Sequence, residues 1–298
     1  MNVKRTPDDQ FLNVPDYPFE ANYLQVTPDL RMHYVDEGPK DGEVVLLLHG
    51  EPSWSFLYRF MIPVFADAGF RVIAPDLIGF GKSDKPTEQS EYSYASHTTW
   101  LHTFIQQLDL SGINLFCQDW GGLLGLRIAG LDNDRFARIV ASNTGLPIGK
   151  GTPSKAFLDW QEYSRTVEVL AIDKIMQNST VRTLSDAEIN AYSTPFPDKT
   201  YMAGAKIFPS LVPISADDPA VPVNVKAFKT LSQSTKPFLC LFSDKDPITK
   251  GGDLIFQKYI KGAEGMPHQV ITEAGHFLQE DKGEEIANIM IRFIKENE

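Results

Sequence analysis

Short, continuously apolar runs alternate with longer segments of helical period from residue 43 onward. The runs are EVVLLLH (43–49), FRVIAP (70–75), INLFCQ (113–118), ARIVAS (137–142), PFLCLFS (237–243) and HQVITEA (268–274). Unbroken hydrophobicity is typical of strands that are covered on both faces, whereas strands with one solvated face alternate apolar and polar residues. The pattern therefore predicts a parallel sheet flanked by helices.

The two ends of the chain extend this picture. Residues 22–27 and 31–38, NYLQVT and RMHYVDEG, indicate a hairpin that continues the sheet antiparallel at one edge. Near the carboxyl terminus, apolar residues recur at i, i+3, i+4, i+7 and i+8, which predicts a helix with one buried face formed by Ile286, Ile289, Met290, Phe293 and Ile294.

One interval breaks the alternation. About ninety residues separate ARIVAS from PFLCLFS, although a simple crossover between parallel strands needs only about a dozen or more. Pieces with helical character recur in this interval, broken by Pro195, Pro197, Pro209 and Pro213. We therefore predict a helical cap domain of residues 146–220, inserted into a core domain of residues 1–145 and 221–298.

Composition narrows the possible partners. The chain has 298 residues, a formal net charge of −11 and 42% hydrophobic residues, so it can bury a large core but offers no basic face to nucleic acid. Its first residues lack the apolar core of a secretory signal, and no stretch reaches the length of about 18 apolar residues that spans a bilayer. We expect a soluble, cytoplasmic protein that binds neither nucleic acid nor membrane.

The two cysteines, Cys117 and Cys240, lie inside apolar runs and are expected to be buried thiols. In the predicted sheet another strand lies between their two strands. Two strand spacings, about 9.5 Å, exceed the reach of about 7 Å that a disulfide allows, so we expect no disulfide.

Candidate reactive groups follow three of the predicted strands. In an open α/β sheet such groups collect beyond the carboxyl ends of the strands. Asp119 follows INLFCQ, Asp246 follows PFLCLFS, and His276 follows the last run. This is the chain order nucleophile, acid, histidine of an α/β-hydrolase, with Asp119 in the place of the usual serine. The sequence therefore predicts an α/β-hydrolase fold with these three residues as its triad.

Local sequence supports two of these assignments. A sharp turn from strand to helix needs small residues two positions before and after the nucleophile; Gly121 meets this requirement, and Cys117 meets it approximately. Taken alone, Asp119 could simply cap a helix. Asp244 competes with Asp246 as the acid, but Asp246 is followed by Pro-Ile, the usual continuation of the acid-bearing turn.

Along nearly its full length the chain resembles the haloalkane dehalogenases. The resemblance runs through HGEPSWSFLYR, APDLIGFGKSDKP, QDWGG, AYSTPFPD and AGHFLQE. It is similar to the subgroup that has glutamate after HG, tryptophan after the nucleophile and the acid after the penultimate strand. This resemblance implies hydrolysis of a haloalkane to a primary alcohol, halide and a proton. The partners are then a small apolar halogenated substrate, water and a halide ion, without metal or organic cofactor.

The residue types suit this reaction. A serine would form an ether with the substrate, which water does not cleave under mild conditions, whereas Asp119 forms an ester whose carbonyl water can attack. His276 is expected to activate the water while Asp246 orients its ring. The backbone N–H groups of Trp120 and Glu51 are expected to stabilise the oxyanion. The side chain of Glu51 either positions the water or is a buried, paired carboxylate.

The departing halide needs uncharged donors, and an indole N–H supplies one. Trp120 is the first candidate; the resemblance implies Trp160 as the second, although by itself Trp160 is compatible with the cap's core. Candidates for the apolar pocket wall, each also compatible with ordinary core packing, are Leu123, Phe157, Phe208, Val212 and Ile248.

Two other functions remain open. An epoxide hydrolase uses the same fold and an aspartate nucleophile, and protonates its substrate with cap tyrosines, for which Tyr163, Tyr192 and Tyr201 are available. Gln118 stands where those enzymes usually have histidine, which argues against this reading. The second possibility is a small-molecule receptor that has lost catalysis, but a receptor has no need of a complete triad.

Overall fold

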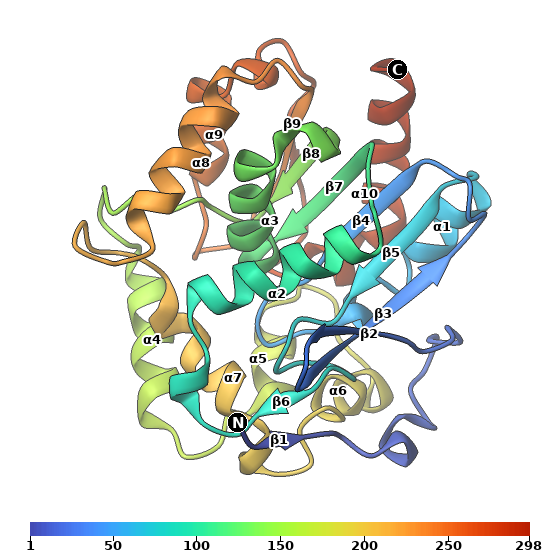
Figure 1. The fold of residues 1–298 in the computed structure, drawn as a ribbon, viewed down its shortest axis with the longest axis vertical. Coiled ribbons are helices and arrows are strands. Elements are labelled where there is room, and N and C mark those ends of the chain that lie inside the picture. The colour runs from blue at the N-terminus through green and yellow to red at the C-terminus, as the bar shows by residue number, and fades with distance from the viewer.

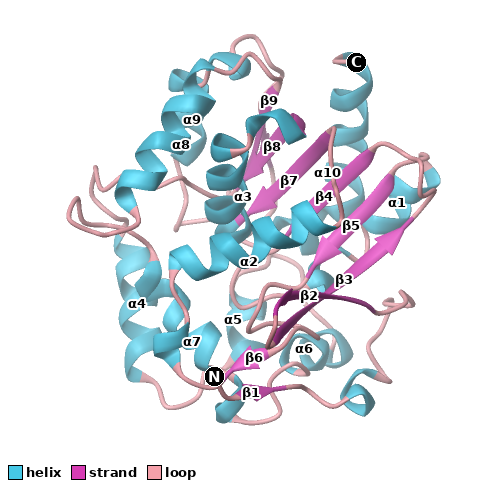
Figure 2. Cartoon of the chain, viewed as in Figure 1, coloured by secondary structure: helices cyan, strands magenta, loops and turns pink.

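The computed structural model describes residues 1–298 as one large sheet with helices on both faces and a group of short helices at one edge (Figures 1 and 2). The sheet has eight strands in the order β10-β9-β8-β7-β4-β5-β3-β2. Their bounds are β2 (Asn22–Thr27), β3 (Leu30–Glu37), β4 (Val44–Leu48), β5 (Arg71–Pro75), β7 (Ile113–Gln118), β8 (Phe136–Ser142), β9 (Phe238–Ser243) and β10 (Gln269–Ile271).

Strand pairing matches the hydrophobic pattern. All pairs from β10 to β5 are parallel, whereas β3 pairs antiparallel with both β5 and β2. The predicted parallel sheet with an antiparallel hairpin at one edge is confirmed. A separate two-stranded sheet joins β1 (Val3–Lys4) to β6 (Lys85–Pro86).

Alternate residues of the central strands belong to different apolar clusters. Leu46 and Leu48 of β4 lie in a cluster of 54 buried residues, whereas Val45 and Leu47 lie in a second cluster of 24. Successive side chains of a strand point to opposite faces, so both faces of the sheet are covered. This explains why the strand runs are apolar without alternation.

Helices cover the two faces. On the face of the smaller cluster lie α1 (Ile62–Asp67) and α10 (Leu278–Glu296), and the five residues predicted for the buried face of the last helix are all buried in that cluster. The opposite face is covered by α2 (Tyr94–Gln107), α3 (Asp119–Leu131), α8 (Val221–Gln233) and α9 (Gly252–Tyr259). The short 3₁₀ segments are η1 (Asp8–Phe11), η2 (Ser55–Tyr58), η3 (Gln89–Glu91), η4 (Asn133–Arg135), η5 (Lys199–Tyr201), η6 (Phe208–Leu211) and η7 (Lys261–Ala263).

The long interval between β8 and α8 folds into short helices beyond the sheet. They are α4 (Lys155–Thr166), α5 (Ile172–Asn178), α6 (Asp186–Ser193) and α7 (Ala203–Ile207). Figure 2 shows β5 and β7 ending on the side where these helices lie. We call residues 146–220 the cap; its boundaries as a domain stay a prediction. Among all helices of the structure, none has both the length and the apolar character needed to cross a membrane.

Buried charges join the cap to the sheet domain. Arg59, which follows η2, pairs with Glu280 at the start of α10 and, at 2.9 Å, with Glu188 of α6. Arg182 of the cap contacts both of these carboxylates, and the Tyr192 hydroxyl donates to Glu280. Burial alone would raise the pKa of Glu188, but hydrogen bonds from Arg182 and Ser185 lower it to about 2.

Substituting Arg59 by methionine is expected to lower the free energy of unfolding by about 3–5 kcal/mol, because it leaves the buried carboxylates of Glu188 and Glu280 short of positive charge. Lys155→Met is the matched control: it breaks the exposed pair with Asp159 and should cost less than about 1 kcal/mol. Urea unfolding followed by circular dichroism measures both. Equal stabilities of the two variants would contradict the network's role.

Candidate active site

Asp119 occupies a strained turn between β7 and α3. Its φ is +50°, a region that residues other than glycine rarely adopt. Neighbouring chain holds it there: its N–H donates to the Asn143 carbonyl at 3.0 Å, and its carbonyl accepts from the Thr144 hydroxyl at 2.7 Å. Its carboxylate oxygen Oδ1 accepts from the backbone N–H of Glu51 at 2.8 Å. The turn therefore presents a fixed, hydrogen-bonded carboxylate.

The turn depends on close approach of neighbouring segments. A Cβ at Gly121 would lie 2.0 Å from the Leu48 carbonyl oxygen, so this position accepts only glycine. Two residues before Asp119, the side chain of Cys117 fits into the turn, and its Sγ atom lies 3.7 Å from the Val140 carbonyl oxygen. Cys117 and Cys240 are both buried and free, and β8 lies between their strands, as predicted.

The three predicted triad residues converge from three strand ends. Nδ1 of His276 lies 3.0 Å from Oδ2 of Asp246, and its Nε2 lies 3.5 Å from Oδ2 of Asp119. Asp246 also accepts from the Ile248 N–H at 2.8 Å. Asp244 is exposed and accepts instead from the Ala274 N–H, so it does not compete for the histidine.

The pKa values of His276 and Asp246 are shifted in opposite directions. Burial alone would lower the pKa of His276, but Asp246 and Asp119 raise it to about 10. Burial likewise acts to raise the pKa of Asp246, yet its contacts with His276 and Thr249 hold it at about 2. The two neighbouring aspartates therefore favour the imidazolium form of the ring.

The side chain of Glu51 is a buried carboxyl group close to Asp119. Burial first, and the negative charge of Asp119 second, raise its pKa well above the ordinary value. Its Oε1 atom is buried without a hydrogen-bond partner. Of the two alternatives left open, the buried and paired carboxylate is therefore wrong: the group is buried and unpaired, and it lies beside the candidate nucleophile.

Two indoles face the same cavity as Asp119. Trp120 stacks against Phe208 with ring centroids 4.3 Å apart and an interplanar angle of 7°. Trp160 of α4 stacks on Tyr163 at 5.7 Å. Trp54 donates its indole N–H to the Ala191 carbonyl, whereas the N–H groups of Trp120 and Trp160 have no acceptor in the protein. They are free to bind an anion.

The cavity between cap and sheet has a volume of about 940 Å³. Asp119, Glu51, Trp120, Trp160 and His276 line it. Of the predicted wall residues, four line the cavity, namely Leu123, Phe157, Val212 and Ile248. Further walls that the sequence analysis missed come from the loop after β8 and from α8 and α9, and include Leu146, Ile148, Phe228, Ile255 and Tyr259.

The expectation for Phe208 was wrong. This side chain is fully buried behind Trp120, where it is sandwiched between that indole and Phe80 at 4.9 Å. The next residue, Pro209, lines the cavity instead. Phe208 therefore supports the indole and does not contact the cavity.

The cap tyrosines do not reach the cavity. The Tyr192 hydroxyl donates to Glu280, the Tyr163 hydroxyl accepts from the Ala171 N–H at 3.5 Å, and the ring of Tyr201 lies 4.5 Å from Lys4 Nζ. None of the three is among the lining residues. These three tyrosines are therefore not placed to protonate an epoxide in the cavity.

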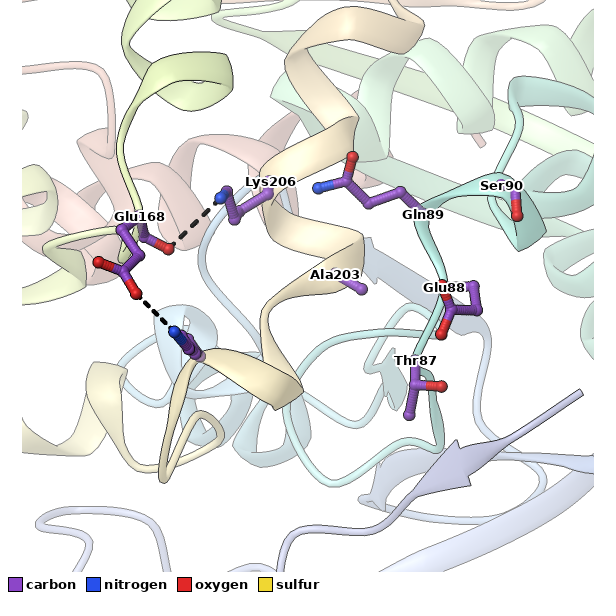
Figure 3. Close-up of a pocket in the computed structure, with 8 residues that line it drawn as sticks. Thr87, Glu88, Gln89, Ser90, Glu168, Ala203 and Lys206 are labelled. Atoms are coloured by element: carbon purple, nitrogen blue, oxygen red, sulfur yellow. Dashed lines mark hydrogen bonds and ion pairs between the residues drawn. The ribbon is translucent and has the colours of Figure 1, made fainter.

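A second pocket, of about 590 Å³, lies on the surface and is lined mainly by polar residues (Figure 3). Lys199 pairs with the Glu168 carboxylate, and Lys206 donates to the Glu168 carbonyl at 3.3 Å. Both lysines of this pocket thus already have partners, and Ala203 is the one hydrophobic residue that lines the pocket. The cavity at Asp119 is the candidate active site.

Comparison with known proteins agrees with this geometry. Residues 43–283 match the family model described as alpha/beta hydrolase fold, which confirms the predicted fold class. The chain is 51% identical to a haloalkane dehalogenase from Psychrobacter cryohalolentis, covering 100% of this chain and 99% of that protein, and 49% identical to one from Mycobacterium marinum, covering 98% and 99%. Among solved structures, the tetrameric haloalkane dehalogenase DpaA from Paraglaciecola agarilytica matches with a TM-score of 0.90 and 38% identity over 97% of each chain.

Proposed function

The chain belongs to the haloalkane dehalogenase family, whose members hydrolyse carbon–halogen bonds, and we propose that in this chain Asp119 attacks the halogenated carbon. The observation that carries the assignment is the state of its carboxylate. Oδ1 is held by the Glu51 N–H, whereas Oδ2 faces His276 and is left to react. As Oδ2 bonds to the carbon, the carbon–halogen bond breaks and its electron pair leaves with the halide.

The two indole N–H groups receive the halide. An anion that enters an apolar cavity needs donors to replace its water. Trp120 and Trp160 both line the cavity and have no other acceptor, so they supply two such donors without adding charge. The π-stack of Trp120 on Phe208 supports the orientation of the first.

Water then hydrolyses the ester. Esterification removes the charge of Asp119, one of the groups that raise the pKa of His276, so the ring can lose its proton and act as the base. Hydroxide adds to the ester carbon, and the negative charge that forms on Oδ1 is stabilised by the Glu51 N–H and, we propose, by the Trp120 N–H. Collapse expels the alkoxide, which takes from His276 the proton that the ring gained from water. The aspartic acid that remains ionises and its proton returns to His276, so that one turnover releases one proton in all.

Release of halide and alcohol separates this function from its closest alternative. We expect acid and free bromide from 1,2-dibromoethane and from 1-bromohexane, and no diol from styrene oxide, because no cap tyrosine faces the cavity. A pH-indicator assay with halide detection measures the first, and chromatography of the products measures the second. Diol formation without halide release would favour an epoxide hydrolase.

Trp160→Phe is expected to weaken halide binding about tenfold to a hundredfold, because a hydrogen bond to a charged partner contributes roughly 1.5–3 kcal/mol. Product inhibition by bromide measures this affinity without relying on tryptophan fluorescence. Trp100→Phe is the matched control, since that indole packs on Tyr92 and His97 and does not line the cavity. Unchanged inhibition in Trp160→Phe would remove this residue from the halide site.

A further inference from the structure

Gln118 contacts the candidate base directly. It is the last residue of β7, fully buried, and its amide nitrogen lies 3.0 Å from Nε2 of His276 and 3.1 Å from the His276 backbone carbonyl oxygen. Its amide oxygen is buried without a partner.

The backbone carbonyl fixes which end of the amide meets the ring. Exchanging nitrogen and oxygen would place two acceptors, the Gln118 oxygen and the His276 carbonyl oxygen, 3.1 Å apart. With the nitrogen in that position, one N–H of the amide donates to the carbonyl and the other points to the ring. The side chain therefore offers Nε2 a donor.

Two groups thus contact the same ring nitrogen with opposite preferences. Since Nδ1–H donates to Asp246, Nε2 of the neutral ring carries a lone pair that can accept from Gln118. In the imidazolium, Nε2 carries a proton that is attracted to Asp119 and faces the amide N–H as a second donor. Asp119 therefore favours the charged ring and Gln118 the neutral ring.

The remaining groups around the ring do not duplicate this effect. The ionisable side chains that face it are Asp119 from the β7–α3 turn, Asp246 from the segment after β9, and Glu51 from the loop after β4. The Asn143 side chain donates to the His276 carbonyl, and the backbone carbonyl of the cap residue Ser179 accepts from the Phe277 N–H. Both of these groups, an amide and a backbone carbonyl, are uncharged.

We propose that Gln118 is a positioning residue that holds His276 in its neutral form once Asp119 has become an ester, so that the ring is ready to accept a proton from water. The proposal rests on the proposed function, in which His276 is the base. While Asp119 is charged, it outweighs the amide; when esterification removes that charge, the amide is the group at Nε2 that remains. Formation of the ester thereby prepares the next step.

The test is Gln118→Met, which keeps the length of the side chain and removes its donors. A limiting amount of 1-bromohexane is mixed with the enzyme, and decay of the alkyl-enzyme is followed by rapid quench and mass spectrometry from about pH 6 to about pH 10. We expect the pH midpoint of the decay to rise by about one unit, with a roughly tenfold slower decay below it, while the rate of halide release stays within about twofold.

Two further variants make the outcome decisive. Gln118→Glu should raise the midpoint further, because a carboxylate favours the imidazolium. Gln279→Met is the matched control: this amide is equally buried, also has an unpartnered oxygen, and contacts Tyr58 in place of the ring, so the midpoint should not move.

A uniform fall in decay rate with an unchanged midpoint in both Gln118 variants would overturn the proposal, as would a parallel loss of halide release. Failure of the proposed function itself is recognised separately, because no alkyl-enzyme would then form in the unsubstituted protein.

Discussion

His276→Phe is expected to release about one halide per enzyme molecule and then stop. The first step needs only the carboxylate of Asp119 and the halide donors, and these stay in place because phenylalanine keeps an aromatic ring against Phe277. The second step needs Nε2, which the substitution removes. Steady-state turnover should fall by at least about 10²- to 10⁴-fold, the usual contribution of a positioned base.

The measurement combines a halide burst with the mass of the intact protein. After incubation with 1-bromohexane, the variant should gain the mass of one hexyl group, located by peptide mapping on the segment that contains Asp119. The protein without the substitution should show the adduct only transiently. A variant that gives neither burst nor added mass would refute the two-step scheme.

Asp119→Ala is expected to abolish both the burst and turnover, with a loss of at least about 10⁴-fold, because the group that forms the covalent bond is gone. Bromide should still bind, since Trp120 and Trp160 remain and the nearest negative charge has been removed. Bromide binding is measured by calorimetry, and product by the halide assay. The two measurements together distinguish an enzyme from a receptor. If the protein were a receptor, the unsubstituted protein would form no product either.

Asp244→Ala is the control for that experiment. Asp244 lies only two residues from the triad acid, but it is exposed and hydrogen-bonded to the Ala274 N–H away from the histidine. Activity should stay within about twofold of the unsubstituted protein. A large loss in Asp244→Ala with little loss in Asp246→Ala would reverse the assignment of the acid.

The strands could be predicted from sequence because burial on both faces makes each one a continuous apolar run. The last strand shows the limit of this rule. The run 268–274 predicts seven residues, but β10 spans only Gln269–Ile271, at the edge of the sheet, where it pairs with β9 alone. Val270 is 62% exposed there, so apolar character at an edge extends beyond the hydrogen-bonded strand.

Convergence of the three triad residues was predictable for a related reason. Asp119, Asp246 and His276 each follow a strand of one parallel sheet, and parallel strands end at the same edge. Their order along the chain then suffices to place them together. No comparable rule orients the residues of the cap.

The pocket wall was predicted less accurately than the triad, because no such rule orients residues of the cap. Phe208 and Pro209 are adjacent at the start of η6, yet Phe208 packs behind Trp120 and Pro209 faces the cavity. A helix of one turn has too few residues for its period to indicate a buried face. The walls supplied by Phe228 and Tyr259 depend on contacts between segments far apart in the chain, which sequence periodicity does not encode.

The buried charges around Arg59 also bear on which part of the cap can move. Lifting the cap at α6 would separate Glu188 from Arg59 in a buried environment, which solvates separated charges poorly. We therefore expect this end of the cap to stay in place. The exposed lining residues lie elsewhere, at Lys150 to Thr152, at Lys250 to Gly251, and at Ile255 and Tyr259 of α9. We therefore expect substitutions at these exposed lining residues, and not loosening of α6, to admit bulkier molecules.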